Sequence, residues 1–223
     1  MAKDSTKTLE NKSKAEAADT KAAFDLYISL MREIKLRLFA IDSLLRNDAG
    51  LPNQIVQESV YLQLRFCCET LAIACLVAHG DIDATKKRSL QSAYEADKII
   101  KQMSELHPGF FPIPIMIAED KGGIIANPVP SNLLKSCLSK DDVVWLWRNA
   151  GGKLHRGKLK NILSHKAQPI TTFPKVTGWR DKFRNLLNQH RIANYDNALH
   201  YLIACNVLYP LKDVSGAISY ANE

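Results

Sequence analysis

Large apolar residues recur at three- and four-residue steps in the first quarter of the chain, and this periodicity constrains the fold more than any other feature. It predicts an amphipathic helix over 22–46, which an Asn-Asp-Ala-Gly stretch at 47–50 ends. Pro52 suits the first turn of a second helix, which runs to His79-Gly80 and is apolar nearly all round in its second half. We therefore expect two long helices joined by a turn, with the second helix at the centre of the fold.

Further helices are expected after the central one. Asp83 can cap a helix that reaches Leu106, a Ser-Lys-Asp-Asp sequence at 139–142 can cap a fourth that stops at Gly151-Gly152, and 179–190 reads as another. A short helix can restart over 158–163. The segment 107–138 holds five of the nine prolines and is expected to be a long ordered loop with a short hairpin at 120–123. Strand-forming residues over 199–209 and 217–220 predict a hairpin.

The predicted fold class is therefore mainly α: a helical bundle of four to six helices with a small C-terminal β-hairpin over 199–220. Residues 1–20 lack an apolar stripe and are expected to form a flexible leader, ahead of a single helical domain over 21–223. No signal peptide is visible, and the apolar run 66–78 is too short to span a bilayer. We expect a cytoplasmic protein without membrane contact, whose five cysteines serve as small buried apolar residues.

Basic side chains are concentrated in one tract. From Val143 to Arg180 the sequence has eight lysines and arginines and no acidic residue, whereas the whole chain has a net charge of +7, so the remainder sums to −1. Clustered cations of this kind attract polyanions in a salt-dependent way. Candidate nucleic-acid-binding residues are Lys153, Arg156, Lys158, Lys160 and Lys166. Aromatic residues of the tract can stack on bases, and because Trp145 and Trp147 do not share a helix face, one should be core and one free.

One constellation in this tract has the residue types needed to cleave RNA. Arg148 and Asn149 are followed by His155, and a seven-residue step is two helical turns, which places Arg148 and His155 on one face of an unbroken helix. A histidine can move a proton near neutral pH, and a guanidinium can stabilise the charge that grows on a phosphate. Asn149 can orient either group, and no metal or other cofactor is needed. The alternative interpretation is a basic turn in which His155 caps the preceding helix.

A second Arg-to-His step occurs near the C-terminus. Arg184 and His190 are six residues apart, which places their side chains about 120° apart on an unbroken helix. They also lie outside the acid-free basic tract. We therefore prefer Arg148 and His155 as the candidate site.

The central helix carries one polar pair on an otherwise apolar stretch. Arg65 and Glu69 are four residues apart, a spacing at which two side chains meet on one helix face. The pair is either a structural ion pair at the helix surface or a polar pair that faces a site, where an unpaired charge would be costly.

An Arg followed at once by a polar residue, and then by a His after four to six intervening positions inside a helical bundle, resembles the signature of the HEPN superfamily. The resemblance covers roughly residues 20–165. It implies an all-α, commonly dimeric and metal-independent ribonuclease of bacterial defence or toxin–antitoxin systems, with Arg148, Asn149 and His155 as the catalytic set. The helix of Arg65 and Glu69 would then be the supporting core helix.

The partners implied by this resemblance are RNA, a second copy of the chain, and an antitoxin or other protein. Two other classes of function stay open from the sequence. The first is a non-catalytic helical interaction module whose basic surface binds nucleic acid or an acidic protein. The second is a purely structural domain in which the charge cluster has no role.

Overall fold

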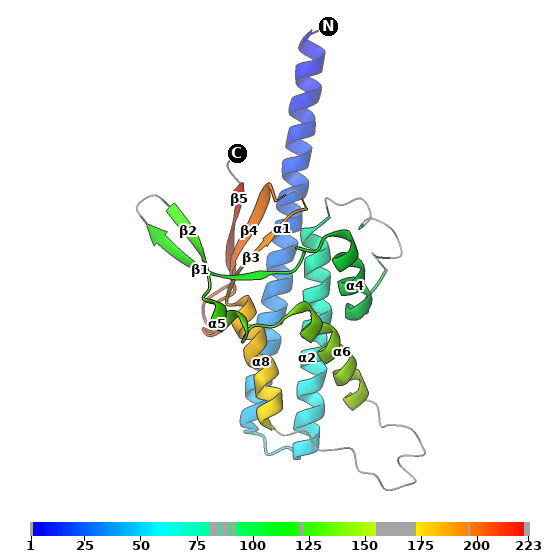
Figure 1. Cartoon of the computed structure of the whole chain (residues 1–223), viewed down its shortest axis with the longest axis vertical. Coiled ribbons are helices and arrows are strands. Elements are labelled where there is room, and N and C mark those ends of the chain that lie inside the picture. The colour runs from blue at the N-terminus through cyan, green and yellow to red at the C-terminus, as the bar shows by residue number, and fades with distance from the viewer. Residues whose placement is uncertain are drawn as a thin grey trace.

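The computed structural model describes residues 2–80, 85, 90, 92–120, 123–154, 173–195 and 197–220. Within these ranges the chain forms six helices and five strands (Figure 1). The helices are α1 (Ala2–Arg46), α2 (Asn53–Ala78), α4 (Ala96–Leu106), α5 (Ser131–Leu134), α6 (Lys140–Leu154) and α8 (Phe173–Leu187). The strands are β1 (Ile113–Asp120), β2 (Gly123–Pro128), β3 (Gln189–Ala193), β4 (Leu199–Ala204) and β5 (Ser215–Tyr220).

The two long helices predicted from the apolar periodicity are present. They are antiparallel and joined by a tight turn in which Asn47 and Gly50 adopt positive φ angles of 53° and 64°. The Asn47 side chain bonds the backbone of Leu51 twice, accepting from its N–H and donating to its carbonyl, both at 2.8 Å. These two hydrogen bonds fix the chain reversal that the sequence predicts. The helix α1 also continues back through residues 2–20, for which the sequence predicts a leader.

The helix α2 lies at the centre of the fold, as predicted, and packs against α1, α4, α6 and α8. By length and composition alone it could cross a membrane, but 56% of its most apolar window is buried inside the protein. It carries three of the five cysteines, and all five are free and buried. Burial raises the pKa of the Cys67 and Cys205 thiols to about 12, so these thiols are inert core groups.

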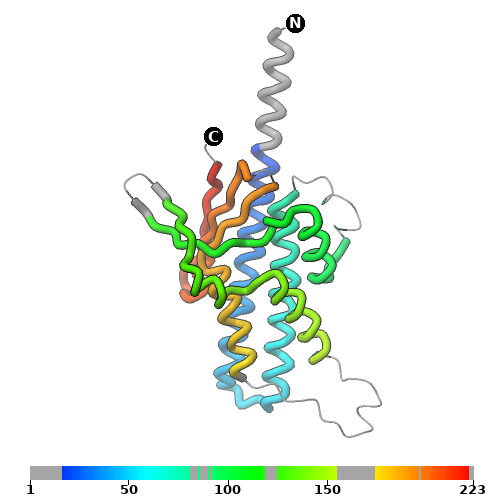
Figure 2. Tube along the Cα trace, viewed as in Figure 1, coloured from blue at the N-terminus to red at the C-terminus, as the bar shows by residue number. Residues whose placement is uncertain are grey.

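The predicted fold class is wrong, because the strands form a substantial second layer. Among the described residues β2, β1, β3, β4 and β5 make one antiparallel sheet in that order, gathered on one side of the helix pair (Figure 2). The expected hairpin over 199–220 exists as β4 and β5, but it is only part of this curled sheet. The segment predicted as a proline-rich loop supplies α5 as well as β1 and β2, and β1 and β2 form the hairpin expected near 120–123.

The remaining strand, β3, begins inside the segment 179–190 that the sequence predicts as helix, and the prediction is therefore wrong for its first two residues. The helix α8 ends at Leu187, and the chain enters β3 at Gln189 with the His190 side chain fully buried. The sheet shares its core with α1: Phe24 and Tyr201 meet edge to face with ring centroids 5.2 Å apart. Tertiary packing of this kind decides between helix and strand, so local propensity alone predicts the end of α8 at the wrong residue.

The sequence predicts the start of α6 correctly but not its end. Its start is the predicted capping box, in which Ser139 N–H donates to the Asp142 carboxylate (3.0 Å) and Asp142 N–H donates to the Ser139 hydroxyl (3.1 Å). Its end is a correction, since α6 does not stop at Gly151-Gly152 but runs to Leu154. The predicted cap at Asp83 and the predicted short helix over 158–163 lie outside the described residues.

Candidate nucleic-acid interface

The two tryptophans of α6 lie on different faces, as predicted. Trp147 is 9% exposed and packs toward α2, whereas Trp145 is 43% exposed. The first therefore belongs to the core. The second lies at the surface.

The polar pair of α2 holds α6 in place. Arg65 and Glu69 form an ion pair at 3.1 Å, with side chains 23% and 19% exposed. The Arg65 guanidinium lies 4.2 Å from the Trp147 ring centroid and donates to the Trp147 carbonyl, while the indole N–H of Trp147 donates to Glu69 (2.7 Å). Of the two interpretations the sequence left open, the structural ion pair is therefore the one that these contacts favour.

A glycine allows this close approach. A Cβ added at Gly151 would lie 2.4 Å from Arg65 Nη1, whereas one added at Gly152 would meet nothing within 4 Å. Gly151 thus leaves room for the guanidinium between the two helices. The glycine pair that the sequence predicts as a helix stop lies inside the helix, and Gly151 of the pair serves its packing against α2.

Arg148 lies on the exposed side of α6 and is held by a residue that sequence reasoning missed. Its Nε donates to Asp97 Oδ2 at 3.1 Å, and its Nη2 lies 3.0 Å from the same oxygen in an ion pair. The Arg148 side chain is 66% exposed and that of Asp97 only 17%. Asp97 lies in the first turn of α4, where an acidic residue is common for helix-dipole reasons alone, so no sequence signal connects it with Arg148.

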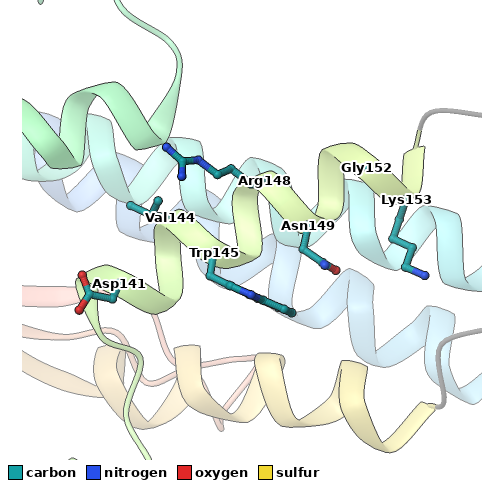
Figure 3. Close-up of a pocket in the computed structure, with 7 residues that line it drawn as sticks. All are labelled: Asp141, Val144, Trp145, Arg148, Asn149, Gly152 and Lys153. Atoms are coloured by element: carbon teal, nitrogen blue, oxygen red, sulfur yellow. The ribbon is translucent and has the colours of Figure 1, made fainter. Parts of the chain in front are cut away.

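A groove of about 730 Å³ runs along this side of α6. Figure 3 shows Arg148 directed toward α4, while Trp145 leaves the helix on the side that faces α8. The groove brings together Arg148, Asn149 and Lys153, three residues that the sequence singled out. All its lining residues among the described ones come from α6: Asp141, Val144, Trp145, Arg148, Asn149, Gly152 and Lys153.

The helix α8 extends this surface with a second aromatic ring and two cations. Trp145 and Trp179 stack with centroids 5.1 Å apart and planes 25° apart. Lys175 Nζ lies 5.4 Å from the Trp145 centroid, and Lys182 Nζ lies 5.0 Å from that of Trp179. We call Trp145, Trp179, Lys175 and Lys182 the tryptophan platform. Sequence analysis noted the aromatic residues of the tract but could not show that α8 lies beside α6.

Charge along α6 is graded from its first turn to its last. Asp141 and Asp142 occupy the first turn, and Lys153 lies in the last. Burial alone would raise the pKa of Asp142, but hydrogen bonds from Lys182 and Ser139 outweigh it, so the pKa lies below its usual range. An anionic ligand is therefore favoured toward the Arg148 and Lys153 end of the groove.

Several predicted site residues fall outside the described part of the chain. They are His155, Arg156, Lys158, Lys160 and Lys166. The helix leads directly to the first of them, since Leu154 is the last residue of α6.

The competing Arg-to-His step is not an open site. Arg184 and Arg180 both bond the Asp42 carboxylate, and the Arg184 side chain is only 15% exposed. His190 is fully buried, and burial lowers its pKa to about 4, although its hydrogen bond to the Leu187 carbonyl acts in the opposite direction. Because that carbonyl can only accept, Nδ1 carries the proton, and Nε2 accepts from the Tyr27 hydroxyl (2.9 Å).

Within the described ranges no group of three His, Cys, Asp or Glu side chains is placed to hold a metal ion. Comparison with protein-family models, with curated proteins and with solved structures finds no match for this chain. The resemblance to HEPN proteins therefore stays a prediction, and its all-α expectation is wrong for this fold.

Proposed function

We propose that the α6 groove binds single-stranded RNA. The observation that carries the proposal is that an exposed indole, Trp145, lines the same groove as Arg148, Asn149 and Lys153. Single-strand binding sites combine cations that follow the phosphates with aromatic rings on which unpaired bases stack. In a duplex both faces of a base are covered by the stacked neighbouring pairs, so this combination favours a single strand over a duplex.

The size and charge of the groove fit that ligand. A volume of about 730 Å³ lies within the ordinary range for small-molecule sites, which is enough for a nucleotide unit. Lys175 adds positive charge beside the stacked rings, whereas the charge of Lys182 is matched by Asp142 at 2.9 Å. Asn149 supplies both a donor and an acceptor, which can pair with a base edge or a sugar hydroxyl.

A stacking variant tests the proposal. Trp145→Ala should weaken binding of a fluorescently labelled single-stranded RNA by about tenfold or more, the usual size of one base–aromatic stack. Tyr220→Ala is the matched control, because Tyr220 is 66% exposed on β5 and lies outside the groove. Fluorescence anisotropy measures both affinities. Equal affinities for the parent protein and Trp145→Ala would move RNA binding away from the groove.

The salt dependence of binding tests the charged part of the groove separately. Lys153→Gln and Lys175→Gln should each lower the slope of log affinity against log salt by about 0.7, the value for one phosphate contact with a single strand. The loss should be the same for all sequences, because phosphate contacts do not read bases. A slope that neither variant changes would contradict phosphate binding at these lysines.

A second candidate function is metal-independent cleavage of the bound RNA. It is favoured by one observation, that α6 stays helical through the glycine pair as far as Leu154. A continuation of the helix by one further residue would place Arg148 and His155 on one face. The imidazole of His155 would move the proton of the 2′-hydroxyl, and the guanidinium of Arg148 would stabilise the phosphate charge. A defence or toxin–antitoxin role is what the HEPN resemblance implies for such an activity.

Cleavage is tested in EDTA. Single-stranded RNA should be cut to products with 2′,3′-cyclic phosphate ends, while DNA stays intact. His155→Ala should lower turnover by about 10²- to 10⁴-fold with little loss of binding, and Arg148→Lys should also impair it because the planar fork is lost. His200→Gln is the histidine control. RNA that binds in the groove but is never cut would favour the non-catalytic interaction module.

A further inference from the structure

A second cavity has a volume of about 200 Å³ and is lined by residues from distant parts of the chain. The residues at the end of α8 that line it, Arg184 and Asn185, are not those of the tryptophan platform. The cavity lining includes three large apolar side chains that are about half exposed: Met116 of β1 (44%), Leu133 of α5 (48%) and Leu208 of the β4–β5 connection (56%). Single exposed apolar residues are ordinary on protein surfaces. Three that surround one cavity indicate a binding surface.

Two residues that line this cavity, Arg184 and Asn188, form what we call its floor, and each carries a buried polar atom that no described residue bonds. Arg184 Nε and Asn188 Oδ1 are buried and make no hydrogen bond among the described residues. The two residues are four apart on and just after α8, so they lie on one side of it. Buried donors and acceptors are nearly always paired, because an unpaired one is costly. The charges of Arg184 and Arg180 are matched by the carboxylates of Asp42 and Asp181, so the floor offers one donor and one acceptor rather than a site for an anion.

The same cavity adjoins a strand edge that the sheet leaves open. The strand β1 pairs with β3 only at Ile113 and Pro114, whereas it pairs with β2 as far as Asp120. Beyond Pro114 a side chain takes the place of a neighbouring strand: Gln189 Oε1 accepts from the Ile117 N–H at 2.9 Å. Gln189 also lines the cavity, so the open edge and the cavity are continuous.

We propose that this cavity is a docking site for an extended peptide segment of a partner protein, anchored by one large apolar side chain. The apolar walls would surround the anchor, and the peptide group beside it would accept from Arg184 and donate to Asn188. The open edge of β1 would receive the flanking backbone, as in recognition by strand addition. A peptide matches the site because it supplies an apolar group, a donor and an acceptor within a few ångströms. A polyanion does not match the site, because the walls are apolar and the charge of Arg184 is already paired.

Methionine methyl NMR tests this docking site directly. Met116 is the exposed methionine of the cavity, while Met31 and Met103 are 1% and 0% exposed and serve as internal references. The probe is the capped pentapeptide acetyl-Ala-Thr-Leu-Thr-Ala-amide, and its Asp-centred counterpart is the matched control. The Leu peptide should shift the Met116 methyl signal saturably and leave those of Met31 and Met103 in place, and the Asp peptide should not. No shift at millimolar Leu peptide, or equal shifts with both peptides, overturns the proposal.

Two variants locate the binding. Asn188→Leu removes the floor acceptor and should weaken the Leu peptide by about fivefold or more, the equivalent of one ordinary hydrogen bond. Leu208→Glu places a charge on the exposed rim without disturbing the core and should do the same. Leu211→Ala is the control, since Leu211 is fully exposed and does not line the cavity. A Met116 shift that grows with protein concentration and without peptide would instead identify a second copy of the chain as the occupant.

Discussion

Two Arg-to-His steps occur in this chain, and the fold places them in opposite environments. In α6 the Arg148 side chain is 66% exposed at a groove and has one carboxylate partner, Asp97. In α8 the Arg184 side chain is 15% exposed and shares Asp42 with Arg180, and His190 is buried against Tyr27. Two similar Arg-to-His spacings therefore lead to an exposed arginine in one region and to buried side chains in the other.

The difference shows that chemistry follows environment rather than pattern. A histidine acts as an acid and base near neutral pH only if its charged form is tolerated. Burial removes that tolerance at His190, where the pKa falls to about 4 and both ring nitrogens are occupied by Leu187 and Tyr27. Its role is to join α1 to the sheet. The α6 step keeps its arginine at a surface that a phosphate can reach.

The largest expected effect concerns the buried histidine. His190→Gln should lower the free energy of unfolding at pH 7 by about 3 kcal/mol, because it removes a packed ring and disturbs the bond to Tyr27. Urea denaturation followed by circular dichroism measures the loss. A loss below about 0.5 kcal/mol, the range of an unconstrained surface site, would erase the contrast between the two regions.

The pH dependence of stability tests the same residue independently. The folded pKa of His190 is about 4 and the ordinary value is 6.5, so the unfolded chain binds more protons between these values and stability falls as the pH is lowered through this window. Between pH 7 and pH 5 the loss from this group is about 2 kcal/mol. The His190→Gln variant should lose that much less over the same range. Equal losses in both proteins would show that His190 is not buried in its neutral form.

Sequence reasoning was most successful for the helices whose apolar spacing is regular. The periodic residues of α1 and α2 line the core, and the Ser139 capping box begins α6 at the predicted place. These signals are local, since a helix face and a cap depend on residues three or four apart. They survive in the fold because the packing agrees with them.

The sheet could not be predicted because its pairing is not local. The strand β1 meets β3 across more than seventy residues, with Pro114 opposite His190. Prolines at Pro114 and Pro128 made the segment read as loop, although a proline lacks only its own N–H and is tolerated where the ladder does not need that donor. Nothing in the spacing of one segment reveals which distant segment it will pair with.

The residues of the candidate site also fall into those that the sequence could predict and those that it could not. Arg148, Asn149 and Lys153 could be found from the sequence, because they belong to one helix and one charge cluster. Asp97 could not, and Lys175, although it belongs to the same basic tract, could not be placed beside α6, since each comes from another element and meets α6 only in the fold. A local pattern identifies the residues of a helix face, and tertiary packing adds those that complete it.

A pair of arginine variants would sharpen the comparison between α6 and α8. Arg184→Met should lower the free energy of unfolding by about 2 kcal/mol, because it breaks a partly buried ion pair while Asp42 keeps Arg180. Arg148→Met should cost about 1 kcal/mol or less, as exposed pairs do, yet it should weaken RNA binding. Urea denaturation and anisotropy measure the two properties on the same samples. If Arg184→Met weakened RNA more than Arg148→Met did, the assignment of the groove would be reversed.

The smallest expected effect tests whether α6 is seated on α2 through its glycine. Gly151→Ala should lower the free energy of unfolding by about 1–2 kcal/mol, because the added Cβ would lie 2.4 Å from an Arg65 guanidinium that Trp147 already holds. Gly152→Ala is the matched control in the same helix. Its Cβ meets nothing within 4 Å, so the better helix propensity of alanine should raise stability by about 0.5–1 kcal/mol. Opposite signs in urea denaturation would show that Arg65 fixes the position of the groove. Two stabilising substitutions would mean that the guanidinium moves aside freely, and Arg65 would then have no part in positioning α6.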